Sequence, residues 1–310
     1  MRRILAIVFV MLWGRGEGAD ILIVHALATK SHVNFVRPLA EALGGKGHRV
    51  TLATPYDLRS ARNVEALKIP GLDVMFEDAG KVVWVQGGAA GWLGLVKRFG
   101  HINDFSSVVC NASLNFPPLR KYLEGRKKVD LVMTSVFFED CLLSIPYRNN
   151  VPFVYMSPGG YMPHQVYLQG HFENPSFVPI VMTPYTDRMN FWERLNNFLL
   201  YYGIMGYIRY FVFPVQHRLV KKLVGDDIPD LEDLARNASL YLINREFSVQ
   251  HPRPQLPVSI DVGGLHAEPA KPLPKVKFVS GPFDLLRIFL ELMCFLLYRE
   301  PSLFIMQRVK

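Results

Sequence analysis

In the segment that begins at residue 19, hydrophobic residues first form a continuous run and then recur with the period of a helix. The run "ADILIVHA" (19–26) is short, apolar and rich in β-branched residues, which predicts a buried strand. The next apolar residues recur at three- and four-residue spacing, typical of an amphipathic helix; they are Val33, Val36, Leu39, Ala40 and Leu43. Ser31 is a candidate N-cap, and the glycine-rich run at 44–47 ends the helix. Pro38 has no amide N–H, so it predicts a kink or a later start of the regular helix.

The same alternation continues to residue 246. Further strands are predicted at 49–55, 71–78, 129–137, 151–158 and 238–246, with a helix at 139–150. A long aromatic helical region is predicted at 190–224, broken near Gly203–Gly206 and at Pro214. Strands separated by helical segments imply right-handed crossovers. The pattern therefore predicts an α/β fold, with a parallel sheet covered by helices on both faces.

His32 is expected in the loop after the first predicted strand, at the edge where open α/β sheets bind their ligands. An imidazole at this edge is suited to general base catalysis, because its ordinary pKa lies near neutrality. A capping or surface histidine is the alternative, and the residue pattern alone favours it. His25, at the end of the strand, is expected to be a half-buried strand residue.

The N-terminus has the pattern of a secretory signal peptide over residues 1–19. "MRR" is basic, the ten residues of "ILAIVFVMLW" are apolar, and small residues allow cleavage after Gly18 or Ala19. A short buried strand or an uncleaved anchor is the alternative, although ten residues are too few to span a bilayer comfortably. In a secreted protein, the two Asn-x-Ser sequons that begin at Asn111 and Asn237 are candidate glycosylation sites.

Composition narrows the class of protein. The chain has 310 residues, of which half are hydrophobic, enough for a large core in one or two domains. The net charge of +8 comes from scattered basic residues rather than from one basic tract, so nucleic-acid binding is not expected. Cys110, Cys141 and Cys294 are an odd and sparse set, which predicts neither a disulfide framework nor a metal site.

Four ordered segments resemble the UDP-glycosyltransferases, the family of animal glucuronosyltransferases and insect glucosyltransferases. The first, "KSHVNFVRPLAEALGGKGHRVTLATP" (30–55), has the family's histidine, helix and Gly-His-x-Val-Thr pattern. The second is "NPSFVPIVMTPYTDRMNFWERLNNF" (174–198) and the third is "LYLINREFSVQHPRPQLP" (240–257). The fourth, "VGGLHAEPAKPLPK" (262–275), resembles the family's interdomain segment. Together they extend the resemblance over residues 21–275.

The resemblance implies a GT-B glycosyltransferase made of two Rossmann-like halves. The N-terminal half would bind a small lipophilic acceptor, and the C-terminal half would bind the UDP-sugar as co-substrate. His32 matches the family histidine that removes the acceptor hydroxyl proton while the oxygen attacks the anomeric carbon, with inversion. The resemblance implies neither a metal nor a further cofactor.

The family's base is paired with an aspartate after a later strand, which here is the strand predicted at 129–137. Ser135 or Val136 stands where vertebrate members carry that aspartate. The nearest acids are Glu139 and Asp140, and resemblance to the insect branch favours Asp140. Glu139 is the alternative partner, and a surface or capping role for either acid is equally consistent with the pattern.

The resemblance ends at Lys275, which divides the expected chain into a signal peptide (1–19), an acceptor-binding domain (20–275) and a divergent apolar tail (276–310). The donor half and the membrane anchor do not follow in this sequence, so we expect a truncated chain that is inactive alone. A non-catalytic acceptor-binding or regulatory partner of full-length family members is the alternative. The expected location is the endoplasmic reticulum lumen or its membrane, or outside the cell.

The helical region at 190–224 carries aromatic residues at spacings that a core helix uses. Most of them are therefore expected in the core; they are Phe191, Trp192, Phe198, Tyr201, Tyr202 and Tyr207. The alternatives are an apolar acceptor pocket and a peripheral contact with a membrane. Homo-oligomers and hetero-oligomers with family members are further expected partners.

Overall fold

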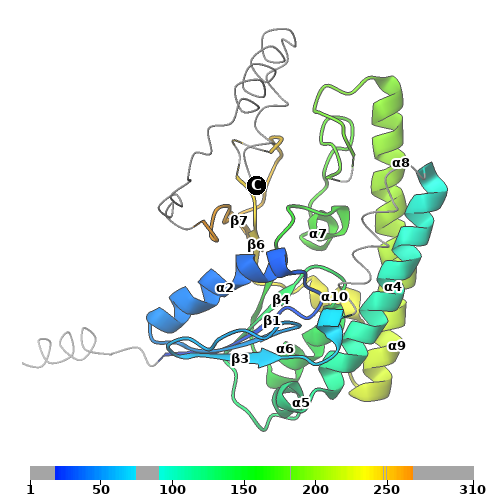
Figure 1. Cartoon of the computed structure of the whole chain (residues 1–310). Coiled ribbons are helices and arrows are strands. Elements are labelled where there is room, and N and C mark those ends of the chain that lie inside the picture. Colours follow the sequence, from blue (N-terminus) through cyan, green and yellow to red (C-terminus); the bar gives the residue numbers. More distant parts are fainter. Residues whose placement is uncertain (1–17, 75–90, 182, 247, 249, 268–310) are drawn as a thin grey trace, which may run out of the picture. The chain divides into compact units, whose positions relative to one another are not determined.

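Seven parallel strands form one sheet in the computed structural model, which describes residues 18–74, 91–181, 183–246, 248 and 250–267. The strand order is β3-β2-β1-β4-β5-β6-β7 (Figure 1). The strands are β1 (Asp20–Val24), β2 (Arg49–Thr54), β3 (Val64–Lys68), β4 (Leu131–Ser135), β5 (Phe153–Ser157), β6 (Leu240–Ile243) and β7 (Ser259–Asp261). Strand β1 pairs with β2 on one side and with β4 on the other. The order of the strands reverses at this point, and in open α/β sheets the region beyond the carboxyl ends of such strands, here β1 and β4, is the crevice that binds ligands.

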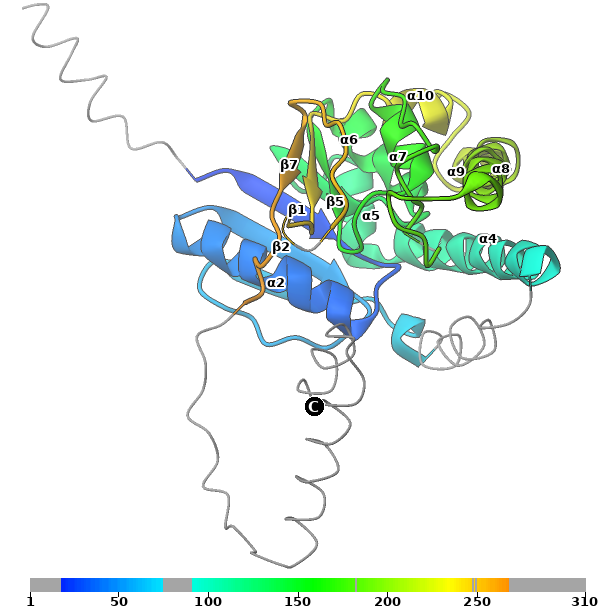
Figure 2. The same ribbon diagram turned by 90° about the horizontal axis from the view of Figure 1, so that it is seen from above.

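Helices cover both faces of the sheet, as the sequence pattern predicts (Figure 2). Helix α2 (Lys30–Gly45) packs on one face, where Phe35, Val36 and Ala40 join a smaller apolar cluster. The larger cluster lies on the opposite face and includes residues of most other helices. These helices are α4 (Gly91–Asn115), α5 (Pro117–Leu123), α6 (Ser144–Asn149), α8 (Phe191–Tyr207), α9 (Phe213–Leu223) and α10 (Leu231–Ala235). The shorter elements are α7 (Pro163–Leu168), the 3-10 turn η2 (Asp140–Leu143) and the π-helical segment η3 (Ile208–Val212).

The third strand lies earlier in the chain than the sequence pattern predicts. The pattern places a strand at 71–78, but Gly71 lies in a turn, Leu72–Val74 are helical, and residues 75–78 lie outside the described residues. The strand is instead Val64–Lys68, which pairs with β2 at every residue. It is an edge strand of which only Val64 is buried, so its sequence has no apolar run to reveal it.

Two helices also differ from the prediction. Helix α2 begins at Lys30, with Thr29 rather than Ser31 at the N-cap position, and it continues through Pro38. Helix α8 continues through Gly203–Gly206 without the predicted break. The departure from α-helical geometry comes later, in the π-helical segment Ile208–Val212, and Pro214 occupies the first turn of α9. Proline is tolerated in a first turn because it has no N–H to leave unpaired there.

A disulfide joins Cys110 in α4 to Cys141 in η2, with the two Cα atoms 6.0 Å apart. The expectation that the cysteines form no disulfide framework was therefore wrong for this pair. The two residues are far apart in sequence, and only the packing of α4 against η2 brings them together. Cys294 lies outside the described residues, as do the predicted signal peptide up to residue 17 and the predicted tail at 276–310.

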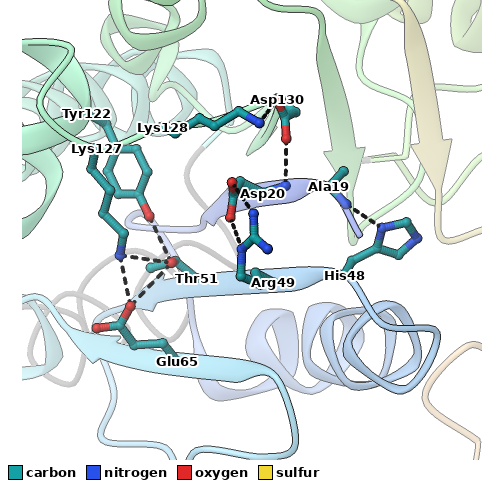
Figure 3. A network of polar contacts seen from close by, with 10 residues as sticks. All are labelled: Ala19, Asp20, His48, Arg49, Thr51, Glu65, Tyr122, Lys127, Lys128 and Asp130. Atoms are coloured by element: carbon teal, nitrogen blue, oxygen red, sulfur yellow. Dashed lines mark hydrogen bonds and ion pairs between the residues drawn. The ribbon is translucent and has the colours of Figure 1, made fainter. Parts of the chain in front are cut away.

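A network of charged and polar residues joins the amino ends of β1 to β3 to the connection between α5 and β4 (Figure 3). The Arg49 guanidinium donates to both carboxylate oxygens of Asp20, at 2.6 and 2.7 Å. The Asp20 backbone N–H donates to Asp130 at 2.8 Å, and Lys127 pairs with Glu65 at 2.9 Å. The charged side chains at this amino edge of the sheet are thus engaged in partly exposed ion pairs within the fold.

Candidate active site

The β1–β4 crevice collects the polar side chains that follow these two strands. His25 comes directly after β1 and is fully buried, not half-buried as expected. His32 lies in the first turn of α2 rather than in the preceding loop, and it is half-buried. Phe137 and Glu139 come from the loop after β4. Two loops that are distant in sequence therefore meet at the predicted edge of the sheet.

Three rings stack across this crevice. The His25 and His32 ring centroids are 5.7 Å apart with an interplanar angle of 13°. His32 stacks in turn on Phe137, at 5.3 Å and 15°. The rings fix the His32 side chain between the end of β1 and the loop after β4.

The surroundings of His32 keep its imidazole neutral. Burial, and secondarily Coulombic repulsion from His25, lower the pKa of His32 to about 3. Its Nδ1 atom is buried and makes no hydrogen bond to any described residue. The imidazole is therefore neutral at physiological pH, the form of histidine that a general base requires.

Glu139 joins the two loops of the crevice. Its side chain is fully buried, and Oε2 accepts the backbone N–H groups of Ala26 and Leu27 at 2.8 Å each. Oε1 accepts the N–H of Ser135 at 2.9 Å and lies 3.5 Å from His25 Nδ1. These donors replace the water that the carboxylate loses on burial.

Asp140, the acid that the resemblance favours, lies in a different environment. The Tyr155 hydroxyl donates a hydrogen bond of 2.5 Å to Asp140 Oδ1, and both side chains are buried. Burial raises the pKa of Asp140 to about 7, a shift that the Tyr155 hydrogen bond opposes and the charge of Glu139 reinforces. Within the described residues, no hydrogen bond or ion pair joins Asp140 to His32. The structure thus groups His25, His32 and Glu139, and it places Asp140 against Tyr155.

The loop that carries both acids is held in an unusual conformation. Phe138 has a φ of 54°, in the left-handed region that side chains other than Asn and Gly rarely adopt. Its carbonyl accepts hydrogen bonds from Ser106 of α4 at 2.5 Å and from Gln216 of α9 at 3.0 Å. Gln216 also accepts the N–H of Cys141 at 2.9 Å. Sequence reasoning missed these positioning residues because they lie on helices distant from the loop.

The predicted glycosylation sites lie on the surface. Asn111 is exposed on α4, although Ser113 of the same sequon is buried. Asn237 is exposed in the turn after α10 and lies in a less regular segment. In the described part of the chain, no group of three or more His, Cys, Asp or Glu side chains is arranged to hold a metal ion.

The aromatic residues of α8 are mostly exposed, so the expectation that most belong to the core was wrong. Phe191, Trp192, Phe198 and Tyr202 are exposed, whereas Tyr201 is buried and Tyr207 is half-buried. Several of them line an open hollow with the segment 172–176. By length and composition alone, the helical stretch Phe191–Leu223 could cross a membrane, a test that core helices of water-soluble proteins also pass.

Comparison with known proteins gives a consistent result. A family model described as "UDP-glucoronosyl and UDP-glucosyl transferase" matches residues 57–280. UDP-glucosyltransferase 2 of Dactylopius coccus is 26% identical over 88% of this chain and 52% of its own length. Human UDP-glucuronosyltransferase 2B10 is 33% identical over 56% of this chain and 33% of its own length. The chain spans about half the length of most of the curated relatives it matches.

Solved structures give a more distant match. The Phytolacca americana UGT2 structure, complexed with UDP-2fluoro-glucose and pterostilbene, aligns at 15% identity and a TM-score of 0.39. It covers 79% of this chain and 54% of its own. The glycotransferase of kitacinnamycin aligns at 12% identity and a TM-score of 0.42, over 84% of this chain and 54% of its own.

Proposed function

Because the chain belongs to the UDP-glucuronosyl and UDP-glucosyl transferase family, we propose that its Rossmann-like sheet forms the acceptor-binding half of a glycosyltransferase. The reaction is transfer of a hexosyl group from a UDP-sugar to the hydroxyl of a small lipophilic acceptor. His32 is the general base. The position of His32 carries this proposal, since its imidazole lies at the carboxyl edge of the sheet and is neutral at physiological pH.

The proposed step is a single inverting displacement. The acceptor hydroxyl donates its proton to His32 as its oxygen forms a bond to the anomeric carbon of the sugar. The bond between that carbon and the UDP oxygen breaks at the same time, and UDP leaves with the electron pair. The rings of His25 and Phe137 on either side of His32 hold the imidazole in place for this transfer.

Binding and transfer are measured separately to test the proposal. The fluorescent phenol 4-methylumbelliferone is titrated against the purified chain, and sugar transfer to it is assayed with UDP-glucose, UDP-glucuronate and UDP-galactose. The same transfer assay is run on residues 20–280 fused to the donor half of UDP-glucosyltransferase 2 of Dactylopius coccus.

We expect His32→Ala to lower turnover of the active form by at least about 100-fold, because general base catalysis contributes this much. Phenol binding should change little. His266→Ala is the matched control, since His266 is an exposed histidine that follows β7 rather than β1 or β4. Undiminished transfer by His32→Ala would refute the role of His32. Phenol binding without transfer in either form would favour the non-catalytic acceptor-binding alternative.

The proposed location is the secretory pathway. The disulfide between Cys110 and Cys141 supports it, because such bonds persist in oxidising compartments. The exposed sequon at Asn237 also supports it. Translation with microsomes should give a glycosidase-sensitive increase in mass that Asn237→Gln removes in part or in full. A chain that stays unmodified and outside the microsomes would contradict the proposed location.

A further inference from the structure

Two neighbouring acids, Glu139 and Asp140, follow β4, but only one of them contacts the histidine stack. Glu139 accepts three backbone N–H groups, two of which belong to the loop between β1 and α2. That loop connects His25 to His32, so the Glu139 carboxylate fixes the segment between the two rings. Asp140 bonds to Tyr155 in the core instead.

The charge of Glu139 lies next to the stack as well. Its Oε1 is 3.5 Å from His25 Nδ1, and the His25 ring lies face to face with His32. Neither ring nitrogen of His25 has a hydrogen-bond partner among the described residues. Glu139 is therefore positioned to balance a positive charge on His25, the ring that contacts both Glu139 and His32.

Other titratable side chains near Glu139 bond to or pack against groups outside the histidine stack. Asp140 is engaged by Tyr155, and Tyr241 packs against Tyr155 on the same side. His164 of α7 stacks on Phe138, and its Nε2 lies 3.2 Å from the Val136 carbonyl. Burial lowers the pKa of His164 to about 4, so it adds no charge at neutral pH.

The fold fixes the direction in which Glu139 points. The left-handed conformation of Phe138 reverses the chain directly before Glu139, so that its side chain returns to the N–H of Ser135 at the end of β4. Ser106 and Gln216 hold the Phe138 carbonyl in this conformation. Strained backbone of this kind persists where surrounding contacts hold it, and it is common at functional sites.

We propose that Glu139 and His25 are the positioning residues of His32. Glu139 holds the β1–α2 loop and balances the positive charge that the stack gains when His32 accepts the acceptor's proton. The proton stays on His32, because the two rings meet face to face and no hydrogen bond joins them. This role deepens the proposed function and rests on it only for the origin of the proton.

Proton uptake by the stack tests the proposal without any transferase assay. Histidine side chains of the full chain are labelled with ¹³C and ¹⁵N, and His25 and His32 are titrated by NMR. We expect Glu139→Gln to lower the pH of first proton uptake by the pair by about 1 unit or more. Asp140→Asn, the matched neighbour, should leave it unchanged. A larger shift in Asp140→Asn, or no shift in a folded Glu139→Gln variant, would overturn the proposal.

A second variant keeps the test decisive if Glu139→Gln does not fold. His25→Phe retains an aromatic ring in the stack but removes its charge. His32 should then titrate at a higher pH than in the wild type, because repulsion from His25 is lost while Glu139 remains. In this background the effect of Glu139→Gln on His32 should be smaller. If His25→Phe leaves the pH at which His32 titrates unchanged, His25 carries no charge in the stack. Neither titration depends on sugar transfer, so the outcome is separate from that of His32→Ala.

Discussion

The crevice at the carboxyl edge of the sheet contains polar residues that are buried, whereas the exposed face of α8 carries apolar residues that are open to solvent. Each is the reverse of the usual distribution. In the crevice, His25 and Glu139 are polar and fully buried. On α8, Phe191 and Trp192 are apolar, yet they remain 68% and 73% exposed. Hydrogen bonds within the fold compensate the burial of Glu139. The polar crevice side chains are therefore coupled to the stability of the fold, whereas those on the exposed face of α8 are not.

The largest effect is expected for Glu139→Ala. It leaves the N–H groups of Ala26, Leu27 and Ser135 without their acceptor, and each buried unpaired group costs free energy. We expect a loss of about 3–5 kcal/mol in the free energy of unfolding, measured by urea denaturation. Glu41→Ala is the control, because Glu41 forms an exposed i,i+4 pair with Arg37 that is worth little. Equal losses in the two variants would remove the distinction between the crevice and the surface.

Asp140→Asn should have an effect that depends on pH. The pKa of Asp140 is about 7 in the folded chain and near 3.8 when unfolded, so the folded state binds the extra proton between these values. Stability of the wild type therefore falls as pH rises through this window. Relative to wild type, the variant should gain up to about 4 kcal/mol between pH 4 and pH 8. A difference in unfolding free energy that is the same at both pH values would contradict this prediction.

Loss of the disulfide is the next largest effect. The bond closes a loop with a sequence separation of 31 between Cys110 and Cys141, next to the segment that carries both acids. The double variant Cys110→Ser with Cys141→Ser should lose about 3–4 kcal/mol, from the added freedom of the unfolded chain. Denaturation of the wild type with and without reductant provides the control. No change in either comparison would show that η2 is held by Gln216 and its neighbours alone.

The smallest effect is expected on α8. Phe191→Ser and Trp192→Ser remove exposed aromatic side chains, so the free energy of unfolding should change by no more than about 0.5 kcal/mol. Asn197→Ala is the contrasting variant on the same helix. The Asn197 amide is buried and donates to the carbonyls of Pro175 and Val178, and its loss should cost about 1–3 kcal/mol. Large losses in the aromatic variants would mean that this face is covered within the fold.

Local patterns were sufficient for the elements next to the site. The apolar run of β1 and the helical period of α2 predict both elements, and with them the place of His32 at the carboxyl edge of the sheet. The order of strands and helices predicts the parallel sheet. These features follow from residues within one or two turns of each other, so a single segment contains the whole signal. The edge strand β3 lacks such a signal and was missed.

Contacts between distant segments decided the rest. Glu139 and Asp140 are adjacent acids, and no local rule tells which of them faces the crevice. The answer depends on the left-handed turn at Phe138, which helices α4 and α9 hold from positions 106 and 216. The pairing of Cys110 with Cys141 and the exposure of the α8 aromatics depend on packing in the same way. The sequence by itself thus determined the layers of the fold and the location of His32 at the carboxyl edge of the sheet. The tertiary structure decided which acid lies beside the two histidines, because burial and orientation are properties of the packed chain.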